Sequence, residues 1–241
     1  MTAYYNEIDP YAAQWLRNLI AAGHIAPGDV DERSIEDVRA NDLAGYSQCH
    51  FFAGLGGWPL ALRIARIAGA QSLWTGSPPC QDNSVAAAIH GGRSGLNGAR
   101  SGLAHVWLDL IAAQRPQGVI FENVPGINPW LTEITSRLGQ LGYRVQQSKR
   151  SSADVGAPHL RRRVWIIADL GGKGLPQPRR PEPPAPFCDP RSTPPGDVFI
   201  TNSGRTRPMD DGLSSRVGAV HAYGNAIDPW AAAEAIRSVM T

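Results

Sequence analysis

The sequence predicts an α/β fold with a doubly wound, mostly parallel sheet. The alternation of two kinds of segment along the chain supports this prediction. Short apolar runs alternate with longer segments whose apolar residues recur at helical spacing, and such alternation is typical of parallel strands joined by crossover helices. The 241 residues are enough for one such domain with a full core and a small appendage.

The elements follow from periodicity and from the residues that end each segment. Strands are expected at residues 3–8, 25–30, 48–52, 72–75, 118–121, 143–149 and 164–168. Helices are expected at residues 11–22, 58–68, 105–114, 130–141 and 228–239. Gly23 suits the C-terminal cap of the first helix and Pro229 the first turn of the last. Ser34 is expected to cap a short helical turn over residues 35–38.

A proline-rich stretch precedes the last helix. Residues 170–208 hold ten of the twenty prolines, with glycine and arginine between them. Proline cannot donate a backbone hydrogen bond, so this stretch is expected to be irregular.

Composition narrows the class of protein. A hydrophobic content of 42% and a charged content of 18% are ordinary for a soluble globular domain. Cys49, Cys80 and Cys188 form neither a disulfide framework nor a CxxC pair of the kind that binds zinc. No apolar run approaches the roughly 18 residues of a membrane span, and the N-terminus does not read as a signal peptide. A cytoplasmic protein without a metal or membrane is therefore expected.

The charge is uneven along the chain. Residues 1–45 carry eight acidic and three basic side chains, whereas residues 46–150 carry four acidic and nine basic ones. A basic, arginine-rich remainder suits a polyanionic partner, although charged runs are usually solvated faces.

A cysteine lies on a stiff loop after the fourth expected strand. Pro78 and Pro79 precede Cys80 and restrict the backbone there. A rigid loop at a strand end can hold a nucleophile, and a thiolate is the strongest nucleophile among side chains near neutral pH. Taken alone, the same pattern also fits a buried structural cysteine.

A glycine-rich turn follows the third expected strand. It comprises Phe52, Ala53, Gly54, Leu55, Gly56 and Gly57. Glycine lets the backbone turn sharply and approach a ligand closely. The turn lacks the P-loop lysine, which disfavours a nucleoside triphosphate.

Five motifs in this order resemble those of the DNA cytosine-5 methyltransferase family. They are Phe-Ala-Gly-Leu-Gly-Gly at 52–57, Pro-Cys-Gln at 79–81, Glu-Asn-Val at 122–124, Arg-x-Arg at 161–163 and Gly-Asn at 224–225. Five ordered motifs are far more specific than any one of them. The resemblance spans about residues 48–169 and 218–239 and implies a Rossmann-like, class I methyltransferase fold. It also implies S-adenosylmethionine as methyl donor and a flipped cytosine of double-stranded DNA as acceptor.

The resemblance implies a role for each matching residue. Cys80 would add to C6 of the cytosine, Glu122 would hold or protonate N3, Arg163 would help to hold the base, and Arg161 would support the same wall. Considered singly, Glu122 could be a surface carboxylate, and residues 161–163 a solvated basic run. The cofactor would meet the glycine-rich turn together with Pro79, Leu103 and Asn225. Residues 86–101 match the position of the family's closing loop, and the DNA would meet Gln81, Ser84 and Arg100.

The family normally places two further strands between the glycine-rich turn and the cysteine, and this chain has no room for them. Residues 6–13 resemble the family's ribose-binding motif and residues 28–31 its adenine-binding motif. A permuted order follows, in which Glu7 binds ribose hydroxyls, Ile8 packs on adenine, and either Asp29 or Asp31 meets the adenine amine. The alternative is an acidic N-terminal appendage.

The chain departs from the family in two places. Asp82 and Asn83 stand where the family usually has a small or proline residue and then phenylalanine. The DNA-reading region is short and rich in arginine, so phosphate contacts and a short or relaxed recognition site are expected. The expected phosphate contacts are Arg179, Arg180, Arg205 and Arg207.

We therefore expect a monomeric cytosine-5 DNA methyltransferase of a bacterial or phage-infected cell, of the type found in restriction-modification. Its catalytic domain would comprise residues 1–169 and 218–241, and residues 170–217 would form a small target-recognition segment. Because Asp82 and Asn83 are unusual, two alternatives stay open. One is a non-catalytic nucleic-acid-binding relative. The other is an enzyme of the same fold that acts on RNA or a nucleotide, or uses a modified donor.

Overall fold

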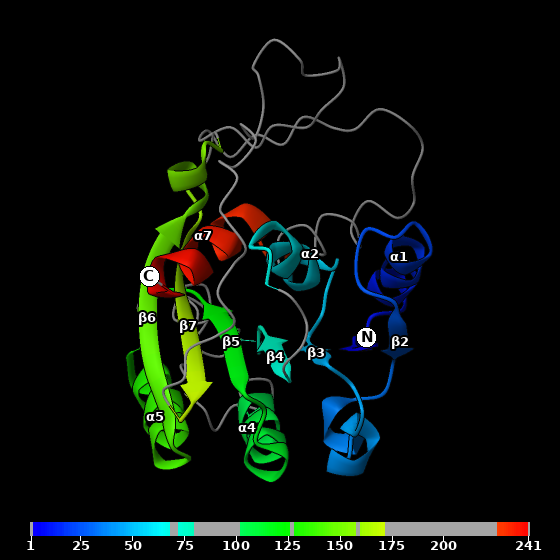
Figure 1. Cartoon of the computed structure of the whole chain (residues 1–241), viewed down its shortest axis with the longest axis horizontal. Helices are drawn as coiled ribbons and strands as arrows, with labels where there is room; N and C mark the ends of the chain where they lie inside the picture. Colours follow the sequence, from blue (N-terminus) through cyan, green and yellow to red (C-terminus); the bar gives the residue numbers. More distant parts are fainter. Residues whose placement is uncertain are drawn as a thin grey trace, which may run out of the picture.

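The computed structural model describes residues 2–67, 72–79, 102–125, 128–157, 160–171 and 226–240. Within these residues, seven strands form one sheet in the spatial order β2-β1-β3-β4-β5-β7-β6 (Figure 1). The strands are β1 Ala3–Asn6, β2 Gly28–Asp31, β3 Gln48–Phe51, β4 Leu73–Gly76, β5 Gly118–Asn123, β6 Tyr143–Ser151 and β7 Arg162–Leu170. The first five strands of the spatial order are parallel, and β7 runs antiparallel to both of its neighbours. The predicted doubly wound, mostly parallel sheet is confirmed.

Helices cover both faces of the sheet (Figure 1). They are α1 Pro10–Ala21, α2 Gly57–Ile64, α4 Leu103–Gln114, α5 Asn128–Gln140 and α7 Pro229–Met240, with short 3-10 helices η1 Ile35–Asp37, η2 Ala40–Leu43 and η5 Ser152–Val155. Side chains alternate between the faces along each strand. In β5, Ile120 packs with α2 and α7, whereas Val119 and Phe121 pack with α4 and α5.

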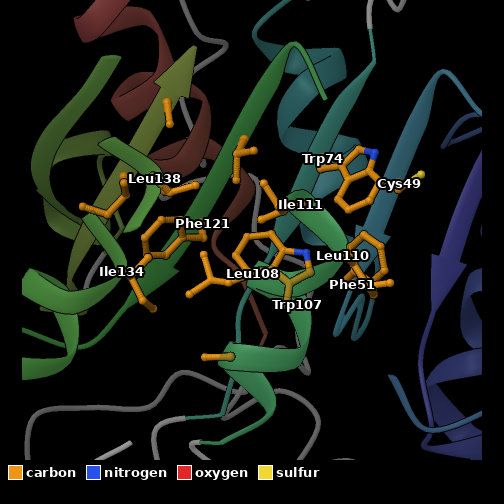
Figure 2. Packing of buried hydrophobic residues seen from close by; sticks show 14 of the residues in the cluster. Cys49, Phe51, Trp74, Trp107, Leu108, Leu110, Ile111, Phe121, Ile134 and Leu138 are labelled. Atoms are coloured by element: carbon orange, nitrogen blue, oxygen red, sulfur yellow. The ribbon is translucent and has the colours of Figure 1, made fainter. Parts of the chain in front are cut away.

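The larger core lies between the sheet and the α4 and α5 layer (Figure 2). Phe51 of β3 lies 5.0 Å from Trp74 of β4 and 6.2 Å from Trp107 of α4, measured between ring centroids. Cys49 is fully buried in the same cluster, and burial raises the pKa of its thiol to about 12. These large aromatic side chains fix α4 against the middle of the sheet.

Helix α1 begins at a well-made cap beside the edge of the sheet. The Asp9 carboxylate accepts hydrogen bonds from the backbone N–H groups of Tyr11 and Ala12, at 2.9 and 3.0 Å. Pro10 occupies the first helical turn, where its missing N–H costs nothing. Leu16 packs beneath the helix against Ala3 and Tyr5 of β1. The acidic N-terminal segment is thereby an integral part of the sheet.

Some predicted boundaries were wrong. The second strand covers Gly28–Asp31 instead of residues 25–30, because Ile25 turns into the core beneath α1. The helix predicted over residues 58–68 ends at Ile64 and is followed by Arg66, whose φ of 57° is left-handed. The last two strands are longer than predicted, since a hairpin pairing continues to Ser151 and Arg162.

No helix in the described part of the chain combines the length and apolar character that a bilayer crossing requires.

Candidate active site

The carboxyl ends of the five parallel strands meet at one edge of the sheet. Asn6 lies opposite both Asp31 and Phe51, and Phe51 lies opposite Gly76. Gly76 in turn lies opposite Phe121. Residues that follow these positions therefore come together, which is the usual ligand-binding edge of an open α/β sheet.

The glycine-rich turn at this edge is held by a carboxylate from the N-terminal segment. The Glu7 carboxylate accepts a hydrogen bond from the backbone N–H of Gly54 at 2.7 Å and another from Asp9 at 2.9 Å. Burial raises the pKa of Glu7, and these hydrogen bonds oppose the rise. Two residues predicted to serve the same ligand, although 47 positions apart, are therefore in direct contact.

The glycines of this turn have different surroundings. Among the described residues, a Cβ added to Gly54 would meet only the Phe52 carbonyl oxygen, at 4.0 Å, so these residues leave the space next to its backbone open. A Cβ added to Gly57 would lie 2.7 Å from the backbone and side chain of Ile227. Gly54 thus leaves room for a ligand, whereas Gly57 lets the segment before α7 pack against the start of α2.

Three more predicted cofactor residues lie near this turn or on the neighbouring strand. Ile8 directly follows Glu7 and is 64% exposed, although it is a large apolar side chain. Asp31 ends β2 opposite Asn6, and its carboxylate binds Arg33 at 2.7 Å and the Tyr4 hydroxyl at 2.7 Å. Asp29 lies two residues earlier on the same face and accepts a hydrogen bond from the Tyr46 hydroxyl at 2.7 Å.

Glu122 forms the centre of a buried charged cluster near the end of β5. Its side chain is 9% exposed, and Oε1 lies 2.5 Å from Nε of Arg163 on β7. Burial raises the pKa of Glu122, while Arg163, Arg161 and the Ser77 hydroxyl favour its ionised form. The structure therefore brings Glu122, Arg161 and Arg163 together and excludes a surface carboxylate or a solvated basic run.

Arg161 connects this cluster to the segment before α7. Its guanidinium donates a hydrogen bond to the Ala226 carbonyl at 2.9 Å. Burial and the neighbouring charge of Arg163 lower the pKa of Arg161, and Glu122 and Asp228 act in the opposite direction. Asp228 also caps α7 by accepting from the N–H groups of Trp230 and Ala231.

The loop that leads to Cys80 is attached to the strand of Glu122. Asn123 is buried, and its side-chain amide donates a hydrogen bond to the Pro78 carbonyl at 3.4 Å. Pro79 is half-buried, and Leu103 begins α4 and packs against the larger core. The remaining predicted site residues lie outside the described residues: Cys80, Gln81, Asp82, Asn83, Ser84, Arg100, Arg179, Arg180, Arg205, Arg207 and Asn225.

Three residues of this region were not predicted as parts of the site. Ser77 lies beside Glu122 and accepts a hydrogen bond from Trp58, and Asp228 lies near Arg161. Ser77 lies just before the Pro-Cys-Gln motif and Trp58 just after the glycine-rich turn, so their closeness to these motifs was the available sequence signal. Asp228 carried a signal only as the residue before the helix-starting Pro229.

The comparison with known families decides between the possible assignments. A family model described as C-5 cytosine-specific DNA methylase matches residues 62–185, slightly more than half of the chain. The chain belongs to this family.

Several type II methyltransferases are similar to this family member over part of its length. M.AplI of Arthrospira platensis is 35% identical over 97 residues, which are 39% of this chain and 27% of the relative. M.XorII of Xanthomonas oryzae is 32% identical over 131 residues, which are 50% of this chain and 29% of the relative. The chain thus spans between a quarter and a third of these relatives.

Solved structures give weaker similarities. A Spodoptera frugiperda DNMT2 mutant has 15% identity and a TM-score of 0.49, covering 74% of this chain and 45% of the other. A prophage-encoded DNA modification methyltransferase of E. coli has 20% identity and a TM-score of 0.45, covering 70% and 40%.

Proposed function

We propose that this member of the C-5 cytosine-specific methylase family transfers a methyl group from S-adenosylmethionine to C5 of a cytosine in double-stranded DNA. The observation that carries the proposal is the buried Glu122 and Arg163 pair, which lies beside the loop leading to Cys80. A carboxyl group with a raised pKa can donate a proton or a hydrogen bond near neutral pH.

Cys80 and Glu122 would share the activation of the base. C5 of cytosine is a poor nucleophile until the Cys80 thiolate adds to C6, which makes C5 enamine-like. The protonated Glu122 carboxyl would donate to N3 and take up the charge that this addition creates. Loss of the C5 proton after methyl transfer would then release the thiolate.

The residues at the glycine-rich turn fit S-adenosylmethionine. When bound, this cofactor would supply an electrophilic methyl group on a sulfonium centre. Gly54 leaves open space next to its backbone, Glu7 offers a carboxylate to sugar hydroxyls, and exposed Ile8 offers an apolar surface to an aromatic ring. We assign Pro79, Leu103 and Asn225 to the same site.

We further propose that the motif order is permuted. β1 lies between β2 and β3 in the sheet, so the N-terminal unit occupies interior and edge positions beside the glycine-rich turn. The hydrogen bond between Glu7 and Gly54 supports this proposal, because an independent appendage would have no reason to supply a half-buried carboxylate to that turn. Asp31 is nearer than Asp29 to the carboxyl edge, but both carboxylates have polar partners.

The target base would have to leave the duplex to reach Glu122, because this residue is buried and only 7% exposed. The arginines of residues 170–217 would bind phosphates, which gives affinity with little sequence reading.

Covalent trapping tests the proposal directly. DNA containing 5-fluorocytosine cannot lose a proton from C5, so the Cys80 adduct should persist in the presence of S-adenosylmethionine. Cys80→Ser should abolish the adduct, whereas Cys49→Ala, at a buried core position, should retain it. DNA binding without trapping or methyl transfer would favour a non-catalytic relative, and trapping on RNA or free nucleotide alone would change the acceptor.

A further inference from the structure

We propose that Trp58 and Ser77 form a hydrogen-bond relay that orients the carboxyl group of Glu122, with Ser77 as a positioning residue of the active site. The relay joins the first turn of α2, next to the cofactor turn, to the carboxyl group that would act on the base. The relay rests on the proposed function only because that function makes Glu122 the group that acts on the base.

The relay follows from how neighbouring strands end. Gly76 lies opposite Phe121 in the parallel pairing of β4 and β5. Ser77 directly follows β4, and Glu122 is the next residue of β5 beyond this pairing, so the two residues lie side by side where the pairing of β4 with β5 ends. The indole Nε1–H of Trp58 donates a hydrogen bond to Oγ of Ser77 at 2.9 Å. The Ser77 hydroxyl is thereby placed to donate to the Glu122 carboxylate, and it lowers the pKa of that carboxyl group.

The chemistry of the three groups sets the direction of the relay. An indole N–H can only donate, and a hydroxyl has one proton and two acceptor lone pairs. Because Oγ of Ser77 accepts from Trp58, its own proton is available to the carboxylate of Glu122. The hydroxyl therefore favours the ionised carboxylate and restrains its rotation.

Trp58 is held firmly enough to serve as the fixed end of the relay. It is fully buried and meets the ring of Trp165 edge to face, with centroids 5.6 Å apart. Trp165 lies opposite Glu122 in the pairing of β5 and β7. The Trp58 indole thus packs on Trp165, the residue paired with Glu122 across the two strands. A small movement at the start of α2 would therefore shift the carboxyl group of Glu122.

The other groups around Glu122 are charged. Arg163 binds it directly, Arg161 adds a second positive charge, and Asp228 faces Arg161. Ser77 is the neutral donor among these described neighbours. Its removal should leave the ion pair intact while making Glu122 harder to ionise, a change that a purely structural residue would not cause.

An NMR titration of ¹⁵N-labelled whole protein tests the relay without requiring activity. Trp58→Phe identifies the Trp58 indole resonance. In the unmodified protein that resonance should shift as Glu122 ionises, and the shift should be absent in Glu122→Gln. Ser77→Ala should abolish this step, and Ser77→Thr should restore it. An unchanged titration in Ser77→Ala would overturn the proposal.

Kinetics supply the second arm. For Ser77→Ala, the alkaline limb of single-turnover methyl transfer should move to higher pH, and the rate below that limb should fall about tenfold. Ser148→Ala, at a buried serine that pairs with Ser238 at 3.2 Å, should change neither readout. A Ser77-dependent titration in a protein without methyl transfer would uphold the relay and reject the proposed function. Methyl transfer with a Ser77-independent titration would do the reverse.

Discussion

Burial shifts the pKa values of two titratable side chains of this sheet in opposite directions. It raises the pKa of Glu122, which faces α2 and α7 near the end of β5. It lowers the pKa of His50, in the middle of β3, to about 3. Both groups are driven toward their neutral forms, but only Glu122 lies at the edge where a substrate could reach it.

Replacement of Glu122 tests its acid role. Glu122→Gln keeps a hydrogen-bond donor but cannot transfer a proton, so methyl transfer should slow by about 10²- to 10⁴-fold. Because the raised pKa keeps Glu122 protonated above the ordinary carboxyl range, the unmodified protein should lose activity as pH rises through that pKa. This limb should vanish in the variant, as measured by single-turnover rates across pH.

Glu133→Gln is the matched control, because Glu133 is a more exposed carboxylate that pairs with His105 on the helical layer. A Glu122→Gln rate within about tenfold of the unmodified protein would contradict the acid role, since general acid catalysis is worth more than that.

His50 should make the fold sensitive to acid. Its ring lies 2.7 Å from Oγ1 of Thr75, is stacked on Tyr5 and is fully buried. The folded-state pKa of about 3 lies below the ordinary histidine value of 6.5, so the unfolded chain takes up the proton first. The resulting stability is present above pH 6.5 and is lost as pH falls toward 3, at about 1.4 kcal/mol per pH unit.

Urea unfolding at pH 7 and pH 4.5 measures this loss. The free energy of unfolding should fall by about 3 kcal/mol more in the unmodified protein than in His50→Gln, which has no titrating ring. Equal losses in the two proteins would show that other groups cause the acid sensitivity.

At the scale of elements, two glycines in helices have different neighbours. Gly57, at the start of α2, would place a Cβ 2.7 Å from the Ile227 backbone, whereas Gly139, in α5, would meet nothing within 4 Å. Gly57→Ala should cost about 1–3 kcal/mol, because the segment before α7 must move. Gly139→Ala should stabilise by roughly 0.5–1 kcal/mol through helix propensity.

Chemical denaturation measures both glycine effects, and equilibrium binding of S-adenosylmethionine provides a second readout. Only Gly57→Ala should weaken that binding, since α2 directly follows the glycine-rich turn, which is the proposed cofactor site. A Gly57→Ala protein as stable as the unmodified one would show that Ile227 yields easily.

Sequence patterns were informative about elements and less so about their ends. In the described part of the chain, patterns of apolar residues identified each α-helix and strand, because the helices bury one face and the strands β1, β4 and β5 are buried on both. Glu122 and Arg163 were expected at or beyond the strand ends, yet both are in the ladder, since antiparallel pairing of β5 with β7 extends to Asn123 and Val164. Such pairing depends on a distant strand, and local residues cannot reveal it. The same holds for Ser77 and Trp58, which meet only once β4 and α2 are packed.

At the scale of the whole molecule, the N-terminal unit is joined to the rest at the amino edge of the sheet. The Ser47 N–H donates to the Thr2 carbonyl and the Leu73 N–H to the Ser47 carbonyl, each at 3.1 Å. The starts of β1, β3 and β4 are therefore neighbours. The order of these strands along the chain can change there without disturbing the carboxyl edge.

A gene in which the strands are rearranged tests whether the order of β1, β3 and β4 along the chain can change. Residues 2–45 placed between Ile67 and Ser72, with glycine-serine linkers, should fold to the same sheet, because one new join links the starts of neighbouring strands and the other crosses only the start of β3. The melting temperature should stay within about 4 °C, which corresponds to about 1 kcal/mol for a chain of this length. S-adenosylmethionine should raise it as in the original order.

The control deletes residues 2–45, which removes β1 and β2 and should abolish cooperative unfolding. A rearranged chain that behaves like the deletion would contradict the permutation.

The burial of Cys49 also means that alkylation of its thiol can report the opening of the fold. A thiol with no exposed surface and a pKa of about 12 is shielded from alkylating reagents at neutral pH while the sheet is closed. Its rate of modification therefore reports how often the centre of the molecule opens, and a bound ligand that slows this labelling stabilises the whole sheet.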